Sequence, residues 1–131
     1  MNDYHFLETV FNHLPFMIAF VDTEKRYRFI NDRYANHFGI VSKADIIGKH
    51  VRDVLGQQLF AILEPNINKA LGGQLVQYEV EDNDIQGAPH FFQGHIIGVF
   101  DRGISLGYIV VIQDITKWRK DIDEQSALGD D

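Results

Sequence analysis

The apolar positions near the start of the chain recur with a helical period. Phe6 and Leu7 are followed, at steps of three or four residues, by Val10 and Phe11 and then by Leu14. This spacing places their side chains on one face of an amphipathic helix, which a proline directly afterwards would end. We predict an N-terminal helix within residues 1–15, whose apolar face packs against its own chain or against a second copy.

Two short apolar runs follow, and both have the length of strands. They cover residues 16–21 and 26–30, and the four polar residues between them are enough for a hairpin turn. Asn31 then stands where a helix N-cap is expected, and Gly39 stands where a helix ends. We therefore expect a β-hairpin followed by one short helix.

The second half of the chain changes from a helical to a strand period. Residues 58–71 have apolar positions on one side and contain Pro65, which predicts a kinked or broken helix. Residues 75–81, 89–100 and 105–113 have strand character. The last strand is apolar on both faces, with Tyr108, Val110 and Ile112 on one and Ile109 and Val111 on the other. A doubly apolar strand predicts a sheet that is covered on both sides.

This order of elements resembles the PAS family of sensory domains, and six sequence pieces carry the resemblance. They are residues 14–22, 27–31, 37–39, 46–49, 70–73 and 114–116, in the family's order and spacing. The resemblance implies an α+β fold with a five-stranded antiparallel sheet in the order 2-1-5-4-3. Short helices would cover one face and the N-terminal helix the other. It divides the chain into a capping or dimer helix at 1–15, a core at 16–114 and a signalling helix or linker at 115–131.

Length and charge exclude several classes of function. The chain has 131 residues, enough for one domain, a net charge of −7 and no basic stripe, so we expect no nucleic-acid partner. No apolar run approaches the roughly 20 residues that span a bilayer, and the start lacks the pattern of a signal peptide. We therefore expect a cytoplasmic domain with no membrane insertion.

The cofactors known in PAS domains can be tested against individual positions. The flavin subclass that forms a thiol adduct needs a cysteine, and Val51 stands at that position in a chain without cysteine. Phe92 and Ile112 stand where flavin-binding members place polar groups, which disfavours noncovalent flavin as well. Haem-binding members place a histidine on the long helix, and residues 58–71 contain none. The identity of any cofactor stays open.

The strand phases and the resemblance together predict an inward-facing set of residues. The apolar members are Ile18, Phe20, Tyr34, Phe38, Ile47, Leu59, Leu63, Phe92, Ile96, Val110 and Ile112, with Gly94 leaving room among them. His50 and Arg52 are the polar candidates beside Tyr34, so the ligand would be small and apolar or weakly acidic. The alternative is an ordinary filled core. We predict no metal site, because His90 and His95 lie on opposite faces of one strand.

These predictions favour a sensory or regulatory module of signal transduction. Asp114 and Thr116 would form the junction to the signalling helix, and the output would be a histidine kinase, a diguanylate cyclase or a transcription regulator. A homodimer would form through Phe6, Leu7, Val10, Phe11, Ile109 and Val111. A ligand-free interaction domain is the alternative. A small enzyme is disfavoured, because we expect no carboxylate on the inward phase of any strand.

Overall fold

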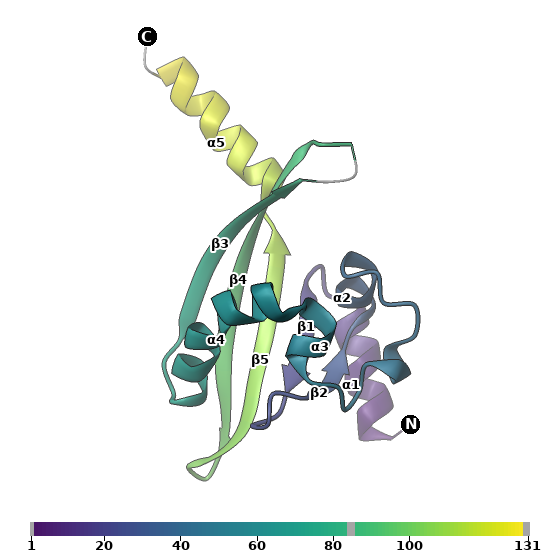
Figure 1. The fold of residues 1–131 in the computed structure, drawn as a ribbon. Helices are drawn as coiled ribbons and strands as arrows, with labels where there is room; N and C mark the ends of the chain where they lie inside the picture. The colour runs from purple at the N-terminus through teal and green to yellow at the C-terminus, as the bar shows by residue number, and fades with distance from the viewer. Residues whose placement is uncertain (1, 84–85, 130–131) are drawn as a thin grey trace.

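The structure is a computed structural model that describes residues 2–83 and 86–129, with only the backbone described for 123–129 (Figure 1). Its elements, in chain order, are α1 (Asp3–Asn12), β1 (Met17–Val21), β2 (Tyr27–Ile30), α2 (Asp32–His37), a 3-10 turn η1 (Lys43–Asp45), α3 (Val51–Leu55), α4 (Gln57–Leu71), β3 (Val76–Asn83), β4 (Pro89–Asp101), β5 (Ile104–Asp114) and α5 (Thr116–Gly129). The predicted order of helices and strands is confirmed.

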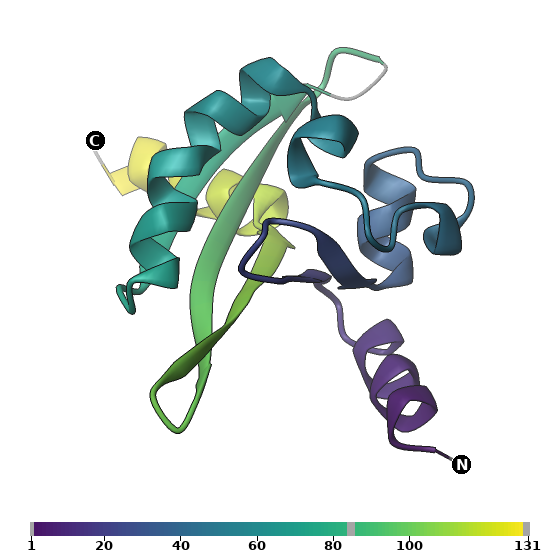
Figure 2. The ribbon, with the colours of Figure 1, turned by 60° about the horizontal axis from the view of Figure 1, so that its bottom comes forward.

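The five strands form one antiparallel sheet in the order β2-β1-β5-β4-β3, which is the order that the resemblance to the PAS family implies. Helices α2, α3 and α4 lie over one face, which we call the inner face, while α1 lies behind β1 and β2 (Figures 1 and 2). The apolar core lies between the inner face and α2–α4. This arrangement confirms the α+β fold.

Helix α4 runs the whole length of the predicted segment and stays helical through Pro65. It changes direction along its length (Figure 2), which accommodates the ring and the missing amide donor. Its last turn approaches β4 at Gly98, where a Cβ atom would lie 2.2 Å from the backbone oxygen of Ala70. Only glycine permits this close helix-to-strand contact.

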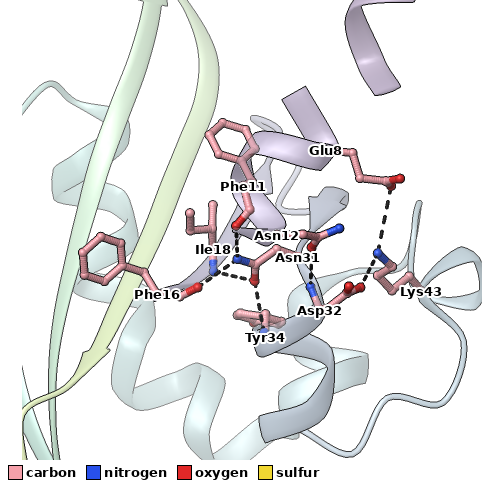
Figure 3. Close-up of polar contacts among 9 residues, drawn as sticks. All are labelled: Glu8, Phe11, Asn12, Phe16, Ile18, Asn31, Asp32, Tyr34 and Lys43. Atoms are coloured by element: carbon pink, nitrogen blue, oxygen red, sulfur yellow. Dashed lines mark hydrogen bonds and ion pairs between the residues drawn. The ribbon is translucent and has the colours of Figure 1, made fainter. Parts of the chain in front are cut away.

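Asn31 joins three elements through its fully buried side chain (Figure 3). Its Oδ1 accepts hydrogen bonds from the backbone N–H groups of Ile18 at 3.0 Å and Tyr34 at 3.1 Å. Its Nδ2 donates to the carbonyl oxygens of Phe11 at 3.1 Å and Phe16 at 2.8 Å. The predicted N-cap of α2 therefore also holds the end of α1 and the start of β1.

Helix α5 leaves the sheet at the end of β5 and extends away from the rest of the domain (Figure 1). Trp118 and Ile122 are exposed on it, at 57% and 39%. Among the described helices, none is long and apolar enough to cross a membrane.

Candidate functional site

A cavity of about 190 Å³ lies between the inner face of the sheet and helices α2–α4. Eight of the predicted inward residues line it: Tyr34, Phe38, Leu59, Leu63, Phe92, Ile96, Val110 and Ile112. The cavity walls are almost entirely apolar, and segments that are distant in the sequence supply them: Val21 of β1 and Tyr27 of β2, together with residues of α2–α4 and of β3–β5. The structure therefore contains a space at the predicted place.

The predicted orientation of β1 is wrong, because Ile18 and Phe20 face the opposite side of the sheet. Ile18 pairs with Val111 and Phe20 pairs with Ile109, and directly paired residues of neighbouring strands share one face. Both side chains line the outer groove described below. Met17, Ala19 and Val21 take the inner positions and belong to the core cluster.

Three further predicted residues lie outside the cavity. Ile47 is 39% exposed, and its neighbour Ile46 packs on the core instead. His50 is the N-cap of α3, where its Nδ1 accepts from the N–H of Arg52 at 3.0 Å, and burial together with the Arg52 charge lowers its pKa. Arg52 is exposed, 3.8 Å from the carboxylate of Asp53, so the cavity has no arginine to attract an acidic ligand.

Gly94 does not leave room for a ligand. Tyr78 on β3 pairs with Gly94 on β4, and a Cβ atom at Gly94 would lie 2.2 Å from the Tyr78 ring carbon Cζ. The tyrosine ring thus occupies the space that the glycine leaves on the inner face. The alternation along each strand predicts that Tyr78 and Gly94 both face inward. It cannot predict that the ring of Tyr78 fills the space beside Gly94, because that depends on how the two strands pair.

The sequence analysis missed two polar residues of the cavity, Asp82 and His37. Asp82 follows Val76, Tyr78 and Val80 on the inward phase of β3, so the expectation of no inward carboxylate is wrong. The strand continues to Asn83, two residues beyond its predicted end, and this extension adds Asp82. Asp82 and His37 also border a second, more polar hollow of about 540 Å³ that includes Arg33, His90 and Asp114. The apolar cavity therefore opens toward a polar mouth.

Four tyrosines line the apolar cavity, namely Tyr27, Tyr34, Tyr78 and Tyr108. The hydroxyls of Tyr27 and Tyr34 share a hydrogen bond at 2.5 Å, and Tyr34 is 3% exposed. Burial raises the pKa of Tyr27 to about 12, partly offset by the hydrogen bond from Tyr34, and it raises the pKa of Tyr34, Tyr78 and Tyr108 as well. All four side chains are therefore neutral at physiological pH.

The predicted exit junction makes a compact set of hydrogen bonds between β5, α5 and β4. Asp114 accepts from the backbone N–H of Thr116 at 2.9 Å and from the Thr116 hydroxyl, and these bonds hold its pKa below the usual value despite partial burial. Thr116 Oγ1 accepts from the N–H of Phe91 at 2.9 Å, and Ile115 N–H donates to the Phe91 carbonyl at 2.8 Å. The start of α5 is thereby fixed to β4 at Phe91.

Two side chains of β4 and α5 reinforce this junction. His90 Nδ1 lies 3.2 Å from Asp114 Oδ2, and both side chains are partly exposed. Arg119 lies 5.5 Å above the Phe91 ring and 2.8 Å from the carboxylate of Glu79. The histidine–carboxylate pair thus lies at the exposed root of the exit helix, outside the apolar cavity.

The outer face of the sheet carries an open apolar groove of about 610 Å³. We call it the outer groove; it is lined by Tyr4, Leu7, Phe11, Leu14, Phe16, Ile18, Phe20, Arg28, Phe29, Ile97, Ile109 and Val111. Helix α1 packs at its edge, where the rings of Phe11 and Phe29 are 5.4 Å apart. Phe6, Leu7 and Val10 are 57%, 49% and 40% exposed.

Histidine and carboxylate side chains do not gather into a metal site among those that the structure describes, in residues 2–83 and 86–122: no group of three or more could hold an ion. His90 and His95 occupy opposite phases of β4, with His90 beside Asp114 and His95 paired with Val111.

Comparisons with known proteins agree with this architecture. A family model described as the PAS fold matches residues 11–120. Among solved structures, the PAS domain of Bordetella pertussis BvgS is 21% identical, with 98% of each chain covered and a TM-score of 0.69. A PAS domain from a two-component sensor histidine kinase is 11% identical, with 86% of this chain and 96% of that chain covered and a TM-score of 0.57.

A third similar structure is a VqmA–ligand–DNA complex from Vibrio cholera, 18% identical with a TM-score of 0.73. It covers 88% of this chain, which corresponds to 53% of that chain. A comparison with curated proteins gives no match. Since the family model spans most of the 131 residues and the strand order agrees with it, the chain belongs to the PAS fold family.

Proposed function

We propose that this domain is a sensory signalling module that couples its apolar cavity to helix α5. One observation carries the proposal: the residues that line the cavity and those that anchor α5 are neighbours on the same two strands. Phe92 lines the cavity and pairs directly with Asp114, while Phe91 binds Ile115 and Thr116. A ligand that displaces Phe92 would therefore disturb the hydrogen bonds at the root of α5.

The size of the cavity supports a small ligand. Its volume of about 190 Å³ is below the roughly 300–1,000 Å³ of typical ligand pockets and close to the ~150 Å³ of a cavity that holds benzene. Flavin and haem would both need a much larger space. We propose a ligand of about the size of one substituted ring, a size that disfavours haem and noncovalent flavin.

We further propose that the module acts as a homodimer through the outer groove and the exposed face of α1. A continuous apolar groove favours self-association, because C2 dimers are the commonest closed assemblies. The output would be a histidine kinase, a cyclase or a transcription regulator, joined to or bound by α5. The net charge of −7 supports signalling to this output through protein–protein contacts, with no direct nucleic-acid contact by this domain.

The domain itself is proposed to have no catalytic role. An acid–base pair must lie together within a pocket that holds a substrate. The His90–Asp114 pair is 35% and 46% exposed, and Asp114 already accepts two hydrogen bonds from Thr116. The hydrogen bonds of Asp114 support a role in holding the start of α5.

The coupling can be tested by filling the cavity. Ile112→Phe adds volume beside Phe92, whereas Ile104→Phe adds the same volume at a position that is 68% exposed on the same strand. We expect faster amide hydrogen exchange at residues 115–122 in the first variant and no change in the second. Equal exchange at these amides in the wild type and in a folded Ile112→Phe protein would refute the coupling.

Two measurements separate the remaining parts of the proposal. Mass spectrometry of small molecules extracted from the purified protein tests for a bound ligand. Light scattering of Val111→Asp, which places a charge in the outer groove, tests the dimer: we expect a dimeric wild type and a monomeric variant. A monomeric wild type would remove the dimer from the proposal and leave the relay intact.

A further inference from the structure

The apolar cavity is surrounded by tyrosines from four different elements. Tyr27 lies on β2, Tyr34 on α2, Tyr78 on β3 and Tyr108 on β5. Four separate segments of the chain thus bring a phenol to one small space, in a cavity whose other walls are aliphatic and phenylalanine side chains except for His37 and Asp82. Such convergence gives the cavity a set of hydrogen-bond donors among apolar walls.

Two of these hydroxyls have no partner. Within the described part of the chain, the hydroxyls of Tyr78 and Tyr108 make no hydrogen bond, although Tyr108 is only 1% exposed. Neither hydroxyl oxygen is completely shut off by packing. Among the described residues, the fully buried side-chain oxygen that has no hydrogen-bond partner is that of Ser105. Buried polar groups are almost always hydrogen-bonded, and leaving one unpaired costs about 1–3 kcal/mol. Unlike such sealed groups, the hydroxyls of Tyr78 and Tyr108 can each donate a hydrogen bond to an acceptor that enters the cavity.

The hydroxyls of Tyr27 and Tyr34 add one more donor. Two hydroxyls that share one hydrogen bond use only one of their two protons. The second proton remains available on whichever tyrosine accepts the bond. The cavity thus offers three phenol protons to an acceptor that enters it.

The charge of the cavity walls favours a neutral occupant. No lysine or arginine lines the cavity among the described residues, and the ionisable groups at its rim are Asp82 and His37. An anion would lie near a carboxylate in an apolar space without a counter-charge, which is costly. The neutral phenols can donate to a carbonyl or ring-nitrogen acceptor without that cost.

We propose that the cavity selects a small neutral molecule that has an apolar ring and a hydrogen-bond acceptor, which the hydroxyls of Tyr78 and Tyr108 bind. This inference rests on the proposed sensory function, because it names the class of ligand that the sensor takes. It replaces the apolar or weakly acidic ligand expected from the sequence, since Arg52 lies outside the cavity.

Three probe molecules of similar size test the proposal in titrations followed by calorimetry. Acetophenone has a ring and a carbonyl acceptor, α-methylstyrene has the same shape with a carbon in place of the oxygen, and benzoate is the anion. We expect acetophenone to bind about five- to tenfold more tightly than α-methylstyrene, the ratio that corresponds to about 1–1.4 kcal/mol for one hydrogen bond. Benzoate should bind more weakly than either.

A matched pair of variants assigns the preference to the cavity. Tyr108→Phe should reduce the preference for acetophenone, because one of its two donors is lost, and should leave the affinity for α-methylstyrene unchanged. Tyr4→Phe removes a hydroxyl from a residue that is 57% exposed on α1 and should change neither affinity. Tyr78→Phe serves as the second cavity variant if Tyr108→Phe does not fold.

The outcomes separate this inference from the proposed function. Equal binding of acetophenone and α-methylstyrene, or tighter binding of benzoate, would overturn the ligand class and leave a ligand-sensing cavity. An acetophenone preference that is undiminished in Tyr108→Phe and Tyr78→Phe would overturn the role of these hydroxyls. Absence of binding by all three probes would overturn the inference and also count against the ligand-dependent form of the sensor, while the exchange test on Ile112→Phe still decides the coupling.

Discussion

Replacing Asn31 by aspartate should detach α1 from the core while leaving the start of α2 in place. The new carboxylate keeps the oxygen that accepts from Ile18 and Tyr34, but it loses the amide that donates to Phe11 at 3.1 Å and Phe16 at 2.8 Å. Two hydrogen bonds are lost at about 1 kcal/mol each, and an oxygen then faces two carbonyl oxygens in a fully buried place. We expect a loss of about 2–4 kcal/mol in the free energy of unfolding.

Urea unfolding followed by circular dichroism measures this loss, and Asn12→Ala is the matched control. Asn12 also joins α1 to α2, through one hydrogen bond from the N–H of Asp32 at 2.9 Å (Figure 3). Its removal should cost only about 0.5–1 kcal/mol, because the bond is exposed to water. Hydrogen exchange at the amides of α1 should rise more in Asn31→Asp than in Asn12→Ala.

The pH dependence of the stability of the Asn31→Asp variant provides a second test. Burial beside two carbonyl groups raises the pKa of the new carboxyl in the folded state above its unfolded value of about 3.9. The cost of the charge is therefore absent below that value and grows as the pH rises toward the folded-state pKa. A variant within 1 kcal/mol of wild type at pH 7, or one equally destabilised at pH 3.5 and pH 7 relative to Asn12→Ala, would refute this account of Asn31.

Two further predictions concern the sheet and the exit junction. Gly98→Ala should destabilise the domain by about 2–3 kcal/mol in the same urea assay, because its Cβ meets the fixed backbone oxygen of Ala70. Gly94→Ala should cost only about 1 kcal/mol, because its Cβ meets the ring of Tyr78, which can move. Equal losses in the two variants would contradict this distinction. Asp114 contributes stability above its unfolded pKa, and this contribution is lost as the pH falls through its lowered folded-state pKa. Acid should therefore lower the protection of the amides at the start of α5 against exchange, once the pH dependence of the intrinsic exchange rate is taken into account. Asp114→Asn should remove that loss of protection, and an unchanged acid response in the variant would disprove the role of Asp114.

Periodicity could predict most of the fold, and the error in β1 shows where it stops. Both faces of β5 are apolar, but the alternation along the strand still predicts which residues share a face. In the structure, Val110 and Ile112 face the cavity as predicted. Residues 16–21 are apolar at every position, so the sequence contains no alternation that could assign an inner face to Ile18. The pairing of Ile18 with Val111 makes that assignment.

The polar part of the candidate site depended even more on tertiary structure. His37 at the end of α2 and Asp82 near the end of β3 are 45 positions apart in the sequence, and only the packing of α2 over the sheet brings both to the cavity. His50 and Arg52 were the polar residues expected beside Tyr34, but the capping of α3 turns His50 toward its own helix. A motif fixes a position along the chain, whereas the direction of a side chain depends on the local helix.

The sequence by itself determined the helices, the strands, their order along the chain and the position of the exit junction. These features follow from local periodicity and from turn and capping residues that act over a few positions. The tertiary structure alone decided which face of β1 is inside, that Tyr78 fills the space at Gly94, and that four tyrosines meet in one cavity. Those features depend on strand register and on the packing of helices over the sheet, which join residues distant in the sequence.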